Sequence, residues 1–259
     1  MKLIPGEGWL PCDLPSQEKK ARIPERNEMT CSLCGGVELI KMKPPRDKRF
    51  YFRCEKCSLI FVPEIFFPSR KAEKSRYLEH YNSIEDSGYV NFLNRAISPA
   101  LKYLNPEMIG LDYGCGYEPV LSQLLRRQHI ECDNYDPLFG FKPSRGNYDF
   151  VFSTECFEHF HQPSLEIDNI IKLLNPGGYL CIMTERWETL ERFNTWYYKR
   201  DPTHVSFFHL KTFEYIIQSF GLVEMYRDRN RIIILKKLEG MDEVVRWEGK
   251  WPEDYFSKI

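Results

Sequence analysis

The stretch LDYGCGYEPVLSQLL, residues 111–125, decides the fold of this chain. An apolar run ends at Asp112, two glycines follow at Gly114 and Gly116, and Val120 opens a segment with leucines at helical spacing. This is the pattern of a strand that enters a glycine turn and leaves as a helix. Such turns hold nucleotide-like ligands, because glycine lets a ligand approach the backbone at the helix N-terminus.

The flanking segments continue the alternation of strand and helix. The strand-like runs MIGLDYG, ECDNYDP, YDFVFST and YLCIMTE are interleaved with helical patterns such as those at 164–174 and 211–220. The sequence NPGG (175–178) is expected to stop the first of these helices and Gly221 the second. The runs LVEMYRD and RIIILKK then predict a terminal hairpin. The whole predicts an α/β fold with a mainly parallel sheet covered by helices.

The glycine turn lacks the full dinucleotide fingerprint and the Walker sequence of triphosphate sites. The third glycine of a dinucleotide fingerprint is replaced by Pro119, and no Walker sequence is present. Asp136 lies 20 residues beyond Gly116, at the end of the next predicted strand. A carboxylate there can accept hydrogen bonds from both ribose hydroxyls, which fits NAD or another adenosine ligand.

Two further motifs, YDFVFSTECFEHF and LLNPGGYLCIMTE, follow in order. Together with the glycine turn and the hairpin they resemble class I S-adenosylmethionine-dependent methyltransferases over roughly residues 107–238. The resemblance implies a Rossmann-like sheet and S-adenosyl-L-methionine as the cofactor. The cofactor-binding residues that it implies are Asp112, Gly114, Cys115, Gly116, Asp136, Pro137, Thr154 and Glu155.

One segment departs from the family pattern. Only eleven residues, 137–147, separate Asp136 from the strand that begins at Tyr148. A helix, a strand and another helix do not fit in this length, so the third strand is expected to be lost or abbreviated. Adenine would then rest on apolar side chains such as Phe139 and Phe141, which could equally serve only to cover the sheet.

Candidates for catalysis lie in two segments. The loop TECFEHFHQP supplies Glu155 and His159, and the insertion RFNTWYYKRDPTHVSFFHL (192–210) supplies His204. Each could contact the acceptor or remove its proton. The aromatic insertion is expected to form a cap over the site, and His204 could instead hold that loop by bonding to its backbone. His161 and His209 are expected to be structural.

Four of the nine cysteines form two CxxC pairs separated by nineteen residues. This is the spacing of a zinc ribbon, in which two knuckles complete a closed tetrahedral thiolate site. The odd total favours a structural Zn²⁺ over a disulfide framework, and four reduced cysteines without metal are the alternative. The predicted metal ligands are Cys31, Cys34, Cys54 and Cys57.

The ribbon carries a basic run at residues 41–56, with seven Lys and Arg against Asp47 and Glu55 and the aromatic trio Phe50, Tyr51 and Phe52. Such a run could contact nucleic acid, although charge runs more often form a solvated hairpin tip. The layout is similar to bacterial large-subunit rRNA guanine-N1 methyltransferases, which join a four-ligand zinc module to this fold. The DPTHVSFFHLKTF segment looks more like methyltransferases of small metabolites or lipid precursors.

The pattern divides the chain into five parts. These are an extended arm at 1–28, the zinc ribbon at 29–62, a linker with helices at 63–105, the methyltransferase domain at 106–238 and a C-terminal tail at 239–259. A helix over 88–104 is expected to be bent or split at Pro99.

Composition gives little further direction. A net charge of −1 with 28% charged residues indicates neither a general nucleic-acid binder nor a disordered acidic chain. The chain has no predicted signal peptide or membrane span, which favours a cytoplasmic protein without a membrane partner. No obligate protein partner is evident.

The leading hypothesis is therefore an S-adenosylmethionine-dependent methyltransferase with a structural zinc ribbon. Its acceptor is unidentified, and a small molecule ranks slightly ahead of RNA. An rRNA or tRNA base methyltransferase that docks through the ribbon is the first alternative. A non-catalytic zinc-ribbon interaction protein with a degenerate methyltransferase domain is the second, and the shortened 137–147 segment keeps it open.

Overall fold

The computed structural model describes residues 29–45, 47–79 and 82–240. The predicted arm at 1–28 and all but the first two residues of the predicted tail lie outside the described residues. Within the described part, no helix is long and apolar enough to cross a membrane.

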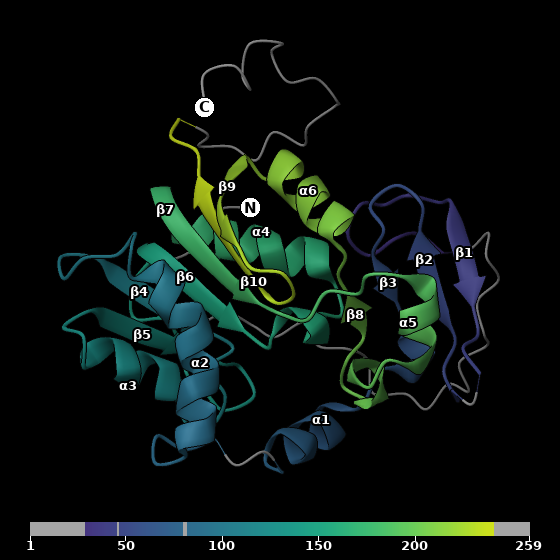
Figure 1. Cartoon of the computed structure of the whole chain (residues 1–259), viewed down its shortest axis with the longest axis horizontal. Coiled ribbons are helices and arrows are strands. Elements are labelled where there is room, and N and C mark those ends of the chain that lie inside the picture. Colours follow the sequence, from purple (N-terminus) through teal and green to yellow (C-terminus); the bar gives the residue numbers. More distant parts are fainter. Residues whose placement is uncertain (1–28, 46, 80–81, 241–259) are drawn as a thin grey trace, which may run out of the picture.

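A six-stranded sheet forms the centre of the molecule, in the order β5-β4-β6-β7-β10-β9 (Figure 1). The four strands β5, β4, β6 and β7 are parallel, and β10 runs antiparallel to both of its neighbours. The predicted Rossmann-like fold and its terminal hairpin are therefore confirmed. The strands are β4 (Ile109–Tyr113), β5 (Glu131–Tyr135), β6 (Tyr148–Thr154), β7 (Leu174–Met183), β9 (Leu222–Arg227) and β10 (Ile232–Lys237).

The abbreviated third-strand region is confirmed as well. β5 is an edge strand, and the segment after it forms only an isolated bridge in which Asp136 and Phe141 exchange backbone hydrogen bonds of 3.1 and 3.0 Å. The chain then returns directly to β6. The short segment therefore folds as a turn beside the end of β5 and adds no strand beyond it.

Helices cover both faces of this sheet (Figure 1). They are α2 (Ser87–Ala100), α3 (Val120–Arg126), α4 (Pro163–Leu173) and α6 (Leu210–Ser219). Side chains of β7 alternate between the faces: Cys181 and Met183 join the core under α2 and α3, whereas Leu180 and Ile182 join the core with α4 and α6. Because both faces of the sheet are buried, the strands read as continuous apolar runs.

Local signals set the helix ends. The Asp86 carboxylate caps α2, which runs unbroken through Pro99 and ends one residue later, so the expected split does not occur. Proline is tolerated there because the last turn can lose one hydrogen bond without breaking the helix. α6 ends before Gly221, which has φ +64° as its stop signal requires. β7 begins at Leu174, earlier than the predicted Tyr179, because Leu174 already pairs with Tyr148.

The cysteine segment forms a second, smaller sheet. β1 (Leu39–Met42), β2 (Tyr51–Cys54) and β3 (Ile60–Phe61) are antiparallel, and the insertion contributes a fourth strand, β8 (Ser206–Phe207). The registers Ile60↔Phe207 and Phe61↔Ser206 join the two regions across about 145 residues of chain. The sequence did not predict this pairing.

Short elements connect the two sheets. They are η2 (Glu64–Phe66), α1 (Arg70–Tyr77), η3 (Phe157–His159), α5 (Leu190–Thr195) and η4 (Tyr198–Arg200). Apolar side chains of the ribbon lie in two continuous cores. Phe52 shares one with Ile167 of α4 and Phe213 of α6, and Tyr51 shares another with Phe193 and Phe207. A segment this short buries too little surface to be stable alone, and the shared cores compensate for that deficit.

Candidate functional site

Three carboxylates meet at one edge of the central sheet. Asp112 lies near the end of β4, Asp136 directly follows β5 and Glu155 directly follows β6. Because parallel strands end at a common edge, the topology brings together residues that are up to 43 positions apart. All the predicted cofactor-binding residues, including Cys115, Pro137 and Thr154, lie at this edge.

The glycine turn fits closely against its neighbours. Gly114 has φ +84°, and a Cβ there would lie 2.4 Å from the Cys156 Sγ, so only glycine fits. Gly116 has φ +71°, and its N–H donates to the Asp136 Oδ2 over 3.0 Å. The N–H groups of Gly114 and Cys115 both donate to the Tyr135 carbonyl. The turn after β4 is thereby fixed to the loop after β5.

The Asp136 carboxylate also holds its own loop. Its Oδ1 accepts hydrogen bonds from the N–H groups of Leu138 (2.9 Å) and Phe139 (3.3 Å). A carboxylate has about four acceptor positions, so capacity remains for a ligand hydroxyl. Burial raises the pKa of Asp136 above its ordinary value, although the backbone hydrogen bonds oppose that change.

Asp112 is the least satisfied group of the site. It is 2% exposed, and its Oδ1 has no hydrogen-bond partner among the described residues. Burial, and secondarily the charge of Asp136, raise the pKa of Asp112 to about 7. An unpaired buried carboxylate costs free energy unless a cation or donor meets it. The site is thus suited to a ligand that carries positive charge.

Aromatic side chains surround the loop after β5. Phe139 lies edge-on to Tyr117 with ring centroids 5.9 Å apart, and the Lys74 Nζ is 5.3 Å from the centroid of Phe139. Arg70 of α1 donates to the Pro137 carbonyl over 2.9 Å. The adenine contact proposed for Phe139 and Phe141 stays a prediction, and the contacts of this loop with α1 and Tyr117 were not predicted from the sequence.

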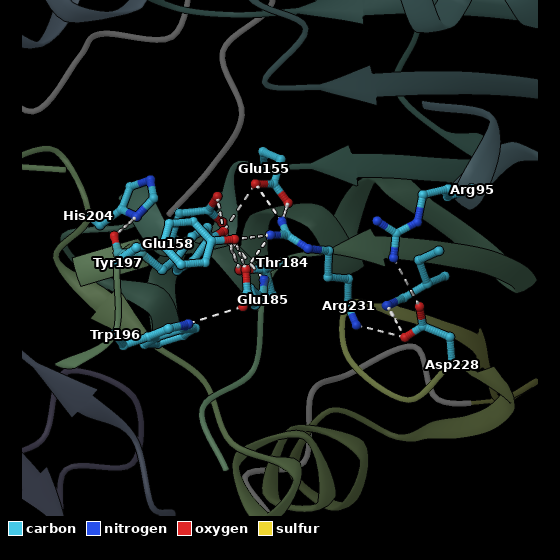
Figure 2. Close-up of polar contacts among 12 residues, drawn as sticks. Arg95, Glu155, Glu158, Thr184, Glu185, Trp196, Tyr197, His204, Asp228 and Arg231 are labelled. Carbon is cyan, nitrogen blue, oxygen red and sulfur yellow. Dashed lines mark hydrogen bonds and ion pairs between the residues drawn. The ribbon is translucent and has the colours of Figure 1, made fainter. Parts of the chain in front are cut away.

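Glu155 joins the sheet edge to the insertion (Figure 2). It has φ +47°, an uncommon backbone conformation for a residue other than glycine, and such conformations concentrate at functional sites. Arg231 donates to both of its oxygens, over 2.9 and 3.1 Å, and also bonds to Glu185 and the Tyr197 hydroxyl. Burial and the neighbouring Glu158 nevertheless raise the pKa of Glu155 to about 8.

Arg231 was not predicted as a site residue. The predicted hairpin could have indicated its position. The last strand of the hairpin is antiparallel to the parallel strands and therefore begins at the edge where they end. A residue just before that strand must lie beside Glu155.

The two predicted catalytic histidines lie together. The rings of His159, on η3, and His204, in the insertion, have centroids 4.9 Å apart. The Nδ1 atoms contact backbone carbonyls, His159 that of Thr203 (3.0 Å) and His204 that of Tyr198 (2.6 Å). Burial lowers the pKa of both, that of His204 to about 3, and thus favours the neutral form of each ring. The histidines neighbour Glu158 more closely than Glu155.

The other two histidines named from the sequence have visible packing roles. His161 stacks on Phe67 with ring centroids 4.1 Å apart. The side chain of His209 accepts from the Lys211 N–H and caps α6.

The four predicted metal ligands converge. The Sγ atoms of Cys31, Cys34, Cys54 and Cys57 all lie within 4.8 Å of one another, with closest pairs at 3.5 and 3.4 Å. Four sulfurs bound tetrahedrally to Zn²⁺ at ~2.3 Å would be about 3.8 Å apart. A Cβ on Gly36 would lie 3.2 and 3.3 Å from two of the sulfurs, so this glycine leaves room for them. The donor set and its spacing fit a closed zinc site.

The two knuckles have the same hydrogen-bond pattern. Cys31 N–H donates to the carbonyl five residues on, and Gly35 N–H donates back to the Cys31 carbonyl. Cys54 and Ser58 repeat both bonds. Gly35 and Ser58 occupy equivalent positions with φ +67° and +58°. The sequence shows this symmetry only in part, because serine gives no signal of a left-handed conformation.

Some polar groups of the basic run bond within the chain, whereas Lys41, Lys43, Lys48 and Lys56 remain exposed. Lys199 of the insertion forms an ion pair with Asp47 at 2.6 Å, with both side chains mostly buried. The Arg49 guanidinium donates to the carbonyls of Lys199, Pro202 and His204, the last over 2.9 Å. Arg53 pairs with Glu55. The basic hairpin therefore contacts the insertion that carries His204.

Comparison with known proteins gives the family. The model of the methyltransferase domain family matches residues 81–224, more than half of the chain. The chain belongs to this family, and fold and family together define an S-adenosylmethionine-dependent methyltransferase domain of class I. No curated protein matches the sequence.

Solved structures with a similar fold include two methyltransferases. One is an S-adenosylmethionine-dependent methyltransferase of Methanosarcina mazei, with 15% identity over 54% of this chain and 97% of that chain, at a TM-score of 0.45. The other is the 1,6-didemethyltoxoflavin-N1-methyltransferase of Burkholderia thailandensis, with 12% identity over 77% of this chain and 100% of that chain, at a TM-score of 0.46.

Proposed function

We propose that this protein transfers a methyl group from S-adenosyl-L-methionine to a small-molecule acceptor, with the cysteine module as a structural zinc ribbon. The observation that carries the choice of acceptor is the contact between the ribbon and the insertion. Arg49 and Asp47 bind the insertion over the site, and β8 extends the ribbon sheet. Arg49 and Asp47 thus position the insertion, which favours an acceptor small enough for the insertion to enclose. Lys41, Lys43, Lys48 and Lys56 of the basic run remain exposed, and the nuclease arm of the test below examines them.

The strand-end edge holds the cofactor in this proposal. S-adenosyl-L-methionine supplies a methyl group on a positively charged sulfur. Asp136 offers its remaining acceptor capacity to ribose hydroxyls, and Gly114 and Gly116 keep the turn free of side chains. Asp112 places a buried negative charge nearby, which favours a cationic ligand.

The groups around the insertion serve the acceptor. Glu155, His159 and His204 are the candidates for removing a proton where the accepting atom carries one. The raised pKa of Glu155, about 8, makes its ionised form a stronger base than an ordinary carboxylate. The aromatic insertion, with Trp196 bonded to Glu185 over 3.0 Å, would exclude water from the acceptor.

The zinc ribbon supports this cap. Four thiolates leave no open coordination position, so a metal held by them has a structural role. Loading the ribbon would fix β2 and β3, and through β8 and Arg49 the segment that carries His204. The zinc ribbon therefore helps to position the side chains of the proposed acceptor site.

The test is to incubate the purified full chain with methyl-labelled S-adenosylmethionine and extract of the source cell. The proposal expects acid-soluble label that resists nuclease, and little label with an Asp136→Ala variant that stays folded. Nuclease-sensitive, acid-precipitable label would instead support an RNA acceptor. Absence of cofactor binding by the zinc-replete wild type would support a non-catalytic interaction protein.

A further inference from the structure

A cluster of three potential ligands lies where η3 meets the insertion. One ring nitrogen each of His159 and His204 and a carboxylate oxygen of Glu158 lie within 4.8 Å of one another. The backbone holds the two segments together, since Val205 N–H donates to the Glu158 carbonyl over 2.8 Å and Ser206 Oγ donates to the Phe160 carbonyl over 2.8 Å. The cluster is therefore built across a tertiary junction.

Both imidazoles have the tautomer that metal ligands use. A carbonyl can only accept, so Nδ1 of each ring must donate its proton to the backbone carbonyl that it contacts. The lone pair of each neutral ring is then on Nε2. A ring N–H bonded to a backbone carbonyl is the usual outer support of a metal-bound histidine, because it fixes the ring and makes the other nitrogen more basic.

Glu158 is oriented in the same way. It has no exposed surface, and its two oxygens accept hydrogen bonds from the hydroxyls of Tyr198 and Thr184, the latter over 2.8 Å. Each oxygen keeps a second lone pair. Burying a carboxylate without a directly bonded cation is costly, and Arg231, whose charge acts on Glu158, donates its hydrogen bonds to Glu155.

We propose that Glu158, His159 and His204 form a second metal site, which takes a divalent transition metal such as Zn²⁺. Two histidines and one carboxylate are a known ligand set for such ions. Ligands on one ion with bonds of ~2.1 Å are separated by ~3 to 4 Å. The candidate ligand atoms lie within 4.8 Å of one another, so binding an ion requires a modest local closure of the three side chains.

This site differs from the cysteine site in what it leaves open. Three protein ligands would leave at least one coordination position open. A histidine bound through Nε2 cannot accept a proton there, so in the metal-loaded protein proton removal falls to Glu155. The proposal concerns metal binding and does not depend on methyl transfer.

The experiment counts metal on the full chain by titrating metal-free protein with Co²⁺ under reducing conditions. Thiolate-to-cobalt absorption reports the cysteine site, and weak visible bands without thiolate absorption report the nitrogen and oxygen site. Two equivalents are expected to bind to the wild type, and one to His159→Ala/His204→Ala. The Glu158→Gln variant, which keeps the side-chain shape and one accepting oxygen, is expected to weaken the second equivalent at least tenfold.

A matched control is His129→Asn, at an exposed histidine after α3 with φ +61°, which asparagine tolerates. This variant is expected to keep both equivalents. A wild type that binds one equivalent, all of it with thiolate absorption, overturns the proposal. Two equivalents retained by the double histidine variant also overturn it. Zinc content measured after dialysis provides the same count without cobalt.

Discussion

The cysteine knuckles and the strand-end site both bury ionisable side chains, sulfurs in the first and carboxylates in the second. The two regions differ in how these groups are partnered. In the knuckles, each local turn holds two sulfurs, the four sulfurs converge, and the two backbone hydrogen bonds of one knuckle are repeated in the other. At the strand ends, Asp112 is buried with an unpaired oxygen and faces the charge of Asp136. The four sulfurs can surround one ion completely. At the strand ends, burial of the ionised Asp112 costs free energy that a cationic ligand would reduce.

The largest expected effect is loss of the metal at the knuckles. Cys54→Ser removes one thiolate, and because metal binding at such sites contributes on the order of 10 kcal/mol, the ribbon and its shared cores should lose tertiary structure. Near-ultraviolet circular dichroism and zinc content measure this. The matched variant Cys132→Ser, at a buried cysteine outside the cluster, should keep its zinc. A folded, metal-free Cys54→Ser protein would contradict the framework role.

A smaller effect tests the unpaired carboxylate. The pKa of Asp112 is about 7 in the folded protein against an ordinary 3.8, so the folded state holds its proton more tightly. Below about pH 4 this tighter proton binding stabilises the folded state by up to about 4 kcal/mol, and the contribution is lost as the pH rises to 7. Urea unfolding of the cofactor-free wild type and Asp112→Asn from pH 4 to 8 should show this difference.

The same variant should separate stability from binding. Asp112→Asn should be relatively more stable near pH 8 yet bind S-adenosylmethionine at least tenfold more weakly, because the cationic ligand loses its counter-charge. Calorimetric titration measures the affinity. If the unfolding free energies of the two proteins depend on pH in the same way, burial of the ionised Asp112 carboxylate does not cost stability.

The smallest effect tests the contact between the ribbon and the insertion that carries His204. Arg49→Ala removes the hydrogen bonds from the ribbon to the carbonyls around His204, and charge-assisted bonds of this kind are worth about 2 kcal/mol. Methyl transfer should fall while cofactor affinity stays near that of the wild type. Lys172→Ala, which breaks an exposed ion pair with Asp168, should change stability by less than ~0.5 kcal/mol. Equal activity of both variants would contradict the link.

Much of the site was visible in the sequence because its signals are local. The glycine turn, Asp136 and Glu155 each follow a strand-like run, and the cysteine spacing defines a knuckle by itself. Arg231 and Glu158 were harder to assign. Arg231 reaches the site only through an antiparallel register, and Glu158 resembles any loop acid until Tyr198 and Thr184 are seen to hold it.

The sequence by itself determined the α/β class, the order of the motifs, the shortened segment after Asp136 and the convergence of the cysteines, since each follows from short-range spacing and periodicity. Only the tertiary structure decided that β8 would complete the ribbon sheet, that Arg49 would hold the loop of His204, and that the two histidines would meet Glu158. These contacts join segments up to about 155 residues apart. Strand pairing and ion pairing at that range depend on how whole layers pack, which local patterns do not encode.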